Sequence, residues 1–259
     1  MKKQLPEFEQ HGIIFQADVQ NSCFRVKEFP SRQLSIFNMK LSKDGYSFHY
    51  GREERDMTRH LTDPHVNVRW LAHYDPEAMA AKYHKSLDKV LGKSDFDIIV
   101  NKRLLNRMLR GERPWVKILG ETFEIAERLF SSIPYLRPRG SFDSTGIRLN
   151  DVDRWTTGYR LPYDPVLKQV QRLDMNSVTE IPENLVLIEI PGIDVLIPMG
   201  YRRELDDEVK MAAMRHPPKL IHEAKVIPWA ESGILQRIEE NRKRMEQKPA
   251  KKKGRKLRR

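Results

Sequence analysis

Basic side chains are gathered at the end of the chain, and the chemistry they offer is phosphate binding. Seven of the last nine residues are lysine or arginine: Lys251, Lys252, Lys253, Arg255, Lys256, Arg258 and Arg259. A polycationic segment gains affinity for nucleic acid by releasing counterions from the phosphates, and it needs little fixed geometry to do so. Phosphate contacts carry no base information, so we expect this segment to bind nucleic acid non-specifically. The alternatives are a solubilising tail without a partner and a tail that binds an acidic protein or a membrane surface.

The position of the charge separates this tail from the rest of the chain. The 259 residues carry a net charge of +11. Residues 236–259 hold 12 Lys/Arg and three Asp/Glu, which is +9, so the rest of the chain is left near +2. The folded part is therefore almost neutral, and we expect residues 248–259 to form a basic, disordered tail.

Three further arginines are spaced for one face of a helix. Arg103, Arg107 and Arg110 follow one another at intervals of four and three, and Arg113 comes shortly after. Such a row could follow a phosphate backbone, but it is more often the solvated side of an amphipathic helix. We expect these arginines to make auxiliary contacts with nucleic acid.

One short pattern resembles a metal-dependent nuclease. Glu223 and Lys225 form a Glu-x-Lys pair, and either Asp194 or Asp206 precedes it. Two carboxylates can hold Mg²⁺ while the lysine steadies the attacking water. The pattern is very common, however, and Glu208-Val209-Lys210 matches it equally well. A Mg²⁺-dependent nuclease is therefore only the third functional hypothesis.

Other catalytic and metal-binding patterns are missing from the sequence. His60, His65 and His73 lack the helical His partner and carboxylate of a zinc hydrolase, and no glycine-rich phosphate loop follows a strand. The single cysteine, Cys23, excludes an internal disulfide and suits a reducing compartment. We expect no metal, no cofactor and no catalytic residue, and we favour a non-enzymatic protein.

Membrane insertion and secretion are not expected. The chain starts with MKKQLPEFEQ, which places proline and glutamates where a signal peptide needs an apolar core. No apolar run in the sequence is long enough to span a membrane. Cytoplasm is the expected location.

The elements that position these residues follow a motif order that occurs twice. The first set is Gly12-x-x-Phe15, Phe24-Arg25, Phe37-Asn38-Met39 and Gly45-Tyr46-x-x-x-Tyr50, and the second is Gly120-x-x-Phe123, Leu136-Arg137, Leu149-Asn150-Asp151-Val152 and Gly158-Tyr159-x-x-x-Tyr163. The numbering offset between matching motifs drifts from 108 at the first motif to 113 at the last. This pattern predicts an internal repeat whose copies diverged by small loop insertions.

Each copy is rich in predicted strands. Short strands are expected over 13–19, 23–26, 34–39 and 46–50, over 115–164 in the second copy, and as a core pair over 185–190 and 195–197. Gly45 is expected to adopt a positive φ in the turn before its strand. The tyrosines at positions 46, 50, 159 and 163 could stack on bases, but recurrence in both copies favours core packing.

Helices are predicted at the ends of the copies. Asp75-Pro76 begins a helix over 77–91, Ser94 caps a helix over 95–110 that braces the copies, and further helices cover 205–215 and 230–246.

These repeated motifs resemble small α/β modules in accessory proteins of bacterial mobile elements, such as conjugative elements and phages. The resemblance covers residues 10–83 and 118–201 and implies no known catalytic residue. It implies a context close to DNA.

We therefore predict an α+β protein of two tandem, related, strand-rich modules. Its parts are a first module over 8–92, a bracing helix over 93–114, a second module over 115–204, a helical region over 205–247 and the basic tail over 248–259. The favoured function is that of an accessory protein that associates with nucleic acid through this tail. The alternative is a protein-interaction or assembly factor of a mobile element or phage, in which a protein partner binds the repeated modules.

Overall fold

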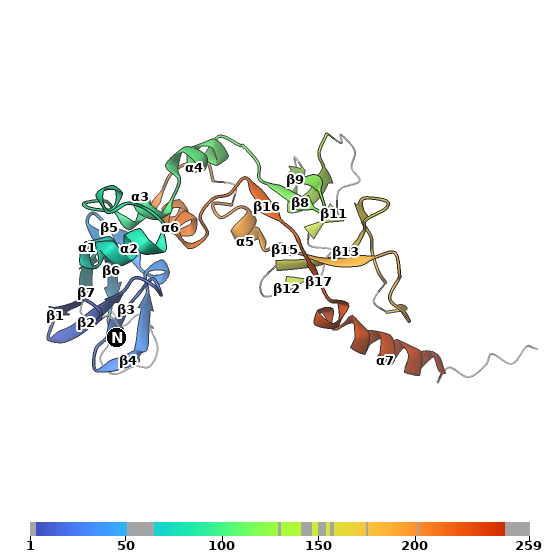
Figure 1. Cartoon of the computed structure of the whole chain (residues 1–259), viewed down its shortest axis with the longest axis horizontal. Helices are drawn as coiled ribbons and strands as arrows, with labels where there is room; N and C mark the ends of the chain where they lie inside the picture. Colours follow the sequence, from blue (N-terminus) through green and yellow to red (C-terminus); the bar gives the residue numbers. More distant parts are fainter. Residues whose placement is uncertain are drawn as a thin grey trace, which may run out of the picture. The chain divides into compact units, whose positions relative to one another are not determined.

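The computed structural model has mixed helices and sheets, which confirms the predicted α+β class (Figure 1). It describes residues 4–50, 65–128, 131–140, 147–149, 154–155, 158–174, 176–200 and 202–246. No helix within these ranges is long and apolar enough to cross a membrane.

The chain divides into two compact units, and each unit takes residues from two parts of the sequence. The first unit is Met1–Glu112 with Ile193–Lys219, and the second is Arg113–Gly192 with Leu220–Arg259. The region over 205–247, which we predicted as one helical region, is thus shared between the two units.

The first unit contains two antiparallel sheets. One has the order β1 (Glu7–Gln10), β2 (Ile13–Asp18), β3 (Cys23–Val26) and β4 (Phe29–Ser35), and the other has the order β5 (Lys40–Ser42), β6 (Gly45–His49) and β7 (His65–Arg69). Phe15, Phe24 and Tyr46 are fully buried and form the centre of its core. The prediction that Tyr46 and Tyr50 pack in the core is confirmed.

Short helices complete the first unit. They are η1 (Ile36–Asn38), α1 (Leu71–Tyr74), α2 (Pro76–Lys82), η2 (Leu87–Lys89), α3 (Asp95–Ile99), α4 (Lys102–Leu109), α5 (Ile193–Leu196) and α6 (Asp207–Arg215). The predicted caps are confirmed, because Asp75 accepts the Ala78 N–H and Ser94 accepts the Asp97 N–H. Helix α6 packs against α3, η1 and β5.

Both long helices predicted in this part of the chain were wrong in length. Helix α2 ends at Lys82, because His84 adopts a left-handed conformation with a φ of 51°. The helix predicted over 95–110 is two helices, because Asn101 is extended and its side chain caps α4 by accepting the Leu104 N–H at 3.1 Å. Asparagine is among the strongest N-cap residues, so it starts a new helix here.

The second unit also has two sheets. The first has the order β11 (Ile147–Arg148), β10 (Ser131–Pro138), β9 (Glu121–Arg128), β8 (Trp115–Ile118) and β16 (Ile221–Glu223), and the second has the order β12 (Arg154–Trp155), β13 (Gly158–Asp164), β15 (Val186–Pro191) and β17 (Lys225–Ile227), with β14 (Gln169–Val170) beside β13. The pairing of β16 with β8 is parallel, and η4 (Trp229–Ser232) and α7 (Ile234–Glu246) follow β17. The core prediction for residues 195–197 holds for Leu196 and Ile197, but Leu196 ends helix α5 and Ile197 follows it, so neither lies on a strand and both belong to the first unit.

The first hairpin has the same geometry in both units. Phe8 lies opposite Phe15 in the β1–β2 pair, and Val116 lies opposite Phe123 in the β8–β9 pair. Positive φ values occur at both central residues of each turn, 53° and 72° at His11-Gly12 and 48° and 92° at Leu119-Gly120. Two central residues with positive φ are typical of the type I′ turn, whose twist suits a two-residue hairpin.

A second shared feature is a glycine at the start of the central strand. Gly45 lies opposite Arg69, and Gly158 lies opposite Pro191. A Cβ at Gly45 would overlap the Val68 carbonyl oxygen, and a Cβ at Gly158 would overlap that of Ile190. The prediction that Gly45 needs a positive φ was therefore wrong, since the glycine is required by the closeness of the neighbouring strand.

The strand registers also change one of the residue matches between the two motif sets, that of Phe37 with Leu149. Leu34 lies opposite Phe24 in the first unit, and Ile147 lies opposite Leu136 in the second. Counting on from these pairs makes Ile36, and not Phe37, the counterpart of Leu149. Both Ile36 and Leu149 are fully buried.

Candidate nucleic-acid interface

The predicted phosphate-binding residues Lys251, Lys252, Lys253, Arg255, Lys256, Arg258 and Arg259 lie outside the described residues, so the prediction for them stays a prediction. Helix α7 is the last described element before this segment (Figure 1). Asn241 Nδ2 donates to the Val178 carbonyl at 2.8 Å, and Arg242 Nε donates to the Thr179 carbonyl at 2.7 Å. Ile234 and Ile238 are buried on the same helix. These contacts hold helix α7 on the second unit.

The charges on α7 are largely used within the folded part. Lys243 Nζ lies 2.9 Å from Glu239 Oε1, and Arg237 lies 3.2 Å from Glu240. The hydrogen bond to Lys243 lowers the pKa of Glu239. Residues 248–259, in contrast, contain eight Lys/Arg and no acid. The unbalanced positive charge therefore begins after the helix.

The three arginines of α4 and its C-cap are exposed, as an amphipathic helix predicts. Arg107 forms a bidentate pair with Glu112, with Nε–Oε2 and Nη2–Oε1 distances of 2.5 Å. Within the described ranges, no carboxylate pairs with Arg103 or Arg110. One of the three charges is therefore balanced, and two are open to solvent.

The residues of the nuclease pattern each have a structural role. Glu223 lies on β16 and pairs with Lys117 at 3.3 Å, where both side chains are exposed. Asp206 caps α6 by accepting the Val209 N–H at 2.7 Å, which lowers the pKa of Asp206. Asp194 faces His216 at 3.4 Å. No group of three or more side chains suited to a metal is found among the residues that the structure describes.

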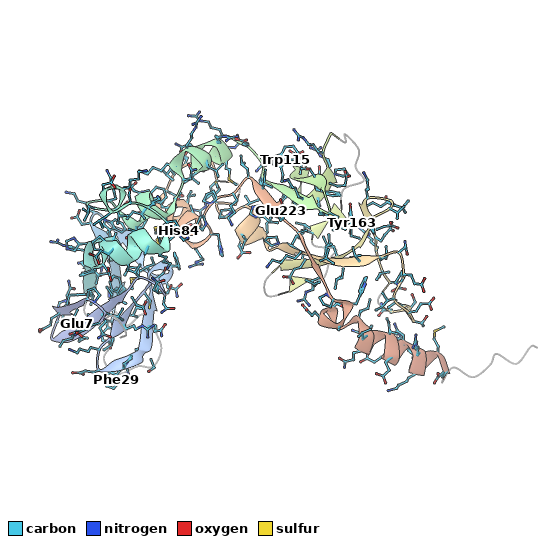
Figure 2. All side chains as sticks on the ribbon, in the orientation of Figure 1. Glu7, Phe29, His84, Trp115, Tyr163 and Glu223 are labelled. Carbon is cyan, nitrogen blue, oxygen red and sulfur yellow. The ribbon has the colours of Figure 1, made fainter. Side chains whose placement is uncertain are left out.

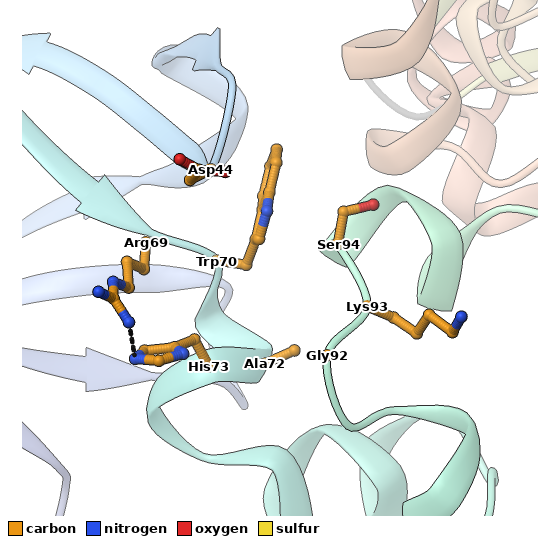
Figure 3. Close-up of a pocket in the computed structure, with 8 residues that line it drawn as sticks. All are labelled: Asp44, Arg69, Trp70, Ala72, His73, Gly92, Lys93 and Ser94. Atoms are coloured by element: carbon orange, nitrogen blue, oxygen red, sulfur yellow. Dashed lines mark hydrogen bonds between the residues drawn. The ribbon is translucent and has the colours of Figure 1, made fainter.

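One pocket lies in the first unit, at the end of β7 (Figure 3). It has a volume of about 310 Å³ and is lined by Asp44, Arg69, Trp70, Ala72, His73, Gly92, Lys93 and Ser94. The Trp70 ring meets the buried Tyr46 ring edge-on at 5.0 Å, and Arg69 Nη1 lies 2.9 Å from His73 Nε2. The lining mixes two cations with one carboxylate, and the Ser94 hydroxyl donates to Asp97 Oδ2 at 2.8 Å. Sequence analysis missed it, because its residues come from three separate segments.

A buried carboxyl group lies next to this pocket. Asp95 has no exposed surface, and it accepts hydrogen bonds from Tyr46 Oη at 2.7 Å and from the N–H groups of Leu71 and Ala72 at 2.9 Å. Burial raises the pKa of Asp95, although the three hydrogen bonds act in the opposite direction. Perturbed carboxyl groups often mark active sites, but here the acceptor sites are used to hold the start of α1. Asp95 is therefore a structural cap.

The open face of the β8–β9–β10 sheet carries aromatic and basic side chains. Trp115 is half-buried and lies opposite Glu124, which in turn pairs with Arg137 at 2.5 Å. The Arg139 guanidinium lies over the Trp115 ring, 4.5 Å from its centroid. Glu223, labelled with Trp115 in Figure 2, lies on the neighbouring strand β16. It is opposite Lys117 in the pairing of β16 with β8. Sequence analysis did not single out the Trp115–Arg139 pair, because a whole hairpin separates the two residues in the sequence.

No protein-family model, curated protein or solved structure matches the chain. The residues and their geometry alone therefore carry the functional interpretation.

Proposed function

We propose that the protein is a non-enzymatic accessory protein that associates with nucleic acid through residues 248–259. The observation that carries this proposal is the charge distribution. The segment holds eight Lys/Arg and no acid, while the rest of the chain holds 39 Lys/Arg against 36 Asp/Glu. A segment of this kind binds phosphates by counterion release, without base specificity.

Helix α7 gives the segment a fixed origin. Its 13 residues correspond to about 20 Å of α-helix, at 1.5 Å per residue. The contacts of Asn241 and Arg242 with residues 178 and 179 hold the helix on the second unit. Nucleic acid bound by the segment is thereby kept near this unit. Arg103 and Arg110 of the first unit, which pair with no described carboxylate, would add weaker contacts.

The two units are best explained as tandem copies of one module. The shared type I′ turns, the shared strand registers and the paired glycines Gly45 and Gly158 support this interpretation. The resemblance to modules of mobile-element proteins remains a sequence-based prediction. A repeated framework also favours a second candidate function, an assembly factor whose two similar surfaces bind a protein partner.

Salt dependence distinguishes these candidates. The full chain and a 1–247 truncation are titrated with single-stranded and duplex DNA and RNA at two salt concentrations. We expect the full chain to show a plot of log affinity against log salt with a slope of about −0.7 to −0.9 for each phosphate contacted, and the truncation to lose most of that slope. A variant with Arg103 and Arg110 changed to Gln is the control, and it should lose at most a small part of the slope.

Equal affinity and equal slope for the full chain and the truncation would overturn the proposal. Capture of a defined protein partner by the 1–247 truncation, together with no nucleic-acid binding by the full chain, would favour the assembly factor.

A further inference from the structure

On the open face of the second unit's first sheet, the fold does not require the side chains of Trp115 and Arg139. Trp115 lies on β8 and Arg139 directly follows β10, and these two strands flank β9. The Arg139 N–H donates to the Thr122 carbonyl at 3.1 Å. The same bond exists in the first unit, where the Lys27 N–H donates to the Ile14 carbonyl at 2.9 Å. Lys27 is therefore the counterpart of Arg139.

The partner of this cation differs between the units. Glu7 lies opposite Gln16 in the first hairpin, as Trp115 lies opposite Glu124 in the second, so Glu7 is the counterpart of Trp115. Lys27 Nζ forms an ion pair with Glu7 at 2.6 Å. The hairpin of the first unit therefore folds with an ordinary surface ion pair at these two positions. In the second unit the same two positions hold an indole and a guanidinium.

We propose that Trp115 and Arg139 form a stacking platform for the bases of single-stranded nucleic acid. This proposal rests on the proposed function, since residues 248–259 would supply the phosphate affinity. Aromatic rings and arginine guanidinium planes both stack on bases, and this stacking tolerates any base. Bases in a duplex are already stacked on one another, so the platform favours single strands.

The surroundings of the platform suit a phosphodiester chain. Arg139 is exposed, and no acidic partner for it is found among the described side chains, so its charge is available to a phosphate. Lys117 is 43% exposed at its side chain and its partner Glu223 is 67% exposed. An exposed pair of this kind is worth little, and Lys117 can exchange it for a phosphate. Arg137, on strand β10 of the same face, forms an ion pair with Glu124.

An extended peptide fits this face less well than a nucleic acid. Peptides commonly bind a sheet by adding a strand at an open edge. The edge of β8 is already occupied by β16, which pairs with it in parallel through Ile221, His222 and Glu223. Besides Glu124 and Glu223, which are paired with cations, the face offers a ring, a guanidinium plane and cations, and these are complementary to bases and phosphates.

The test compares full-length variants at one salt concentration, with a single-stranded oligonucleotide and a duplex of the same length as probes. We expect Trp115→Ala and Arg139→Gln to weaken single-strand binding about tenfold and duplex binding less than twofold. Trp115→Phe keeps a stacking ring and should bind within about threefold of the wild type. Lys27→Ala removes the counterpart cation from the first unit and should leave the preference for single strands unchanged.

Fluorescence gives a second readout that does not depend on Trp115→Ala folding. In a chain with Trp70, Trp155 and Trp229 changed to Phe, the oligonucleotide should quench Trp115 emission, and a poly-glutamate peptide of equal charge should not.

Absence of quenching, or equal losses for single-stranded and duplex probes, would overturn the platform. Quenching by poly-glutamate to the same extent would also overturn it, in favour of an acidic protein partner. The proposed function fails separately, by a salt slope that truncation at residue 247 leaves unchanged.

Discussion

The two units of this chain have the same first-hairpin turn and the same strand registers, and they differ in what their open sheet faces present. Glu7 and Lys27 form an ion pair on the first unit, and at the counterpart positions of the second unit Arg139 stacks on Trp115. The turns, registers and glycines that hold the strands are the same in both units. The comparison separates residues that maintain the fold from residues that are free to acquire a function.

The ends of the central sheets differ in a similar way. Strand β7 is followed by Trp70 and by helix α1, whose first N–H groups are held by Asp95. Strand β15 is followed by Gly192 at the position that corresponds to Trp70, and then by α5. The tryptophan that lines the pocket of the first unit is thus replaced by glycine in the second, and the buried Asp95 lies next to that pocket.

Substitution of the paired glycines should have the largest effect on stability. Gly45→Ala and Gly158→Ala each force a methyl group into the backbone of a neighbouring strand, so we expect each to cost about 3 kcal/mol in the free energy of unfolding. Because the chain has two units, each variant should lower one transition and spare the other. Urea denaturation followed by Trp70 emission for the first unit and Trp115 emission for the second, each in a background without the other tryptophans, measures this.

Gly120→Ala is the control for these variants. Gly120 has a φ of 92°, but no atom lies within 4 Å of the place that its methyl group would take, so only backbone strain opposes the change. A loss of about 1 kcal/mol is expected. Losses at Gly45 and Gly158 no larger than this would show that the close strand contact is not important.

Replacing the buried cap should affect the first unit alone. Asp95→Asn puts an NH₂ group where one oxygen now accepts a hydrogen bond, so one buried donor loses its partner. We expect a loss of about 2 kcal/mol in the first transition and none in the second. Thermal unfolding followed by Trp70 emission measures the change. An unchanged first transition would contradict the structural role of Asp95.

The pH dependence of stability should also differ between the units. Asp164 accepts the N–H groups of Leu167 and Val166 and a hydrogen bond from Asn184, and these bonds lower its pKa. This contribution is present above about pH 4 and is lost as the pH falls through the folded-state value. Asp95 acts oppositely, because its raised pKa makes its contribution decline as the pH rises above about 4.

Between pH 3 and pH 6 we therefore expect Asp164 to add stability to the second transition, while Asp95 subtracts from what Asp18 and Asp97, whose pKa values are lowered, add to the first. Urea midpoints at several pH values measure the two slopes. Asp164→Asn should flatten the slope of the second transition. The same slope in that variant as in the wild type would show that Asp164 is not responsible.

The smallest expected effect comes from transferring the platform to the first unit. Glu7→Trp combined with Lys27→Arg recreates the second unit's pair on an equivalent hairpin, and we expect affinity for single strands to rise about threefold. Fluorescence titration with the same oligonucleotide measures it, and Lys27→Arg alone is the control. No gain from the double variant would show that the platform needs more of the second unit than these two residues.

The sequence predicted the features that depend on local chemistry. The α+β class, the caps Asp75 and Ser94 and the burial of the repeated tyrosines follow from residue type and spacing. The predicted helix lengths were wrong at His84 and Asn101, because each of these residues has a non-helical conformation. The Trp115–Arg139 pair and the pocket at Trp70 could not be predicted, because they depend on strand registers and on segments that are distant in the sequence.

Both units contain residues from late in the sequence, and this affects how the chain folds during synthesis. Helix α6 completes the first unit, and β16 closes the sheet edge of the second. Contacts between residues far apart in the sequence slow folding, because a long loop must close before they form. On the ribosome, the first unit cannot be completed until residues 193–219 have emerged, and the second cannot be completed until residues 220–246 have followed. The edge of β8 is exposed until β16 pairs with it, and both units are completed by consecutive late segments of the chain.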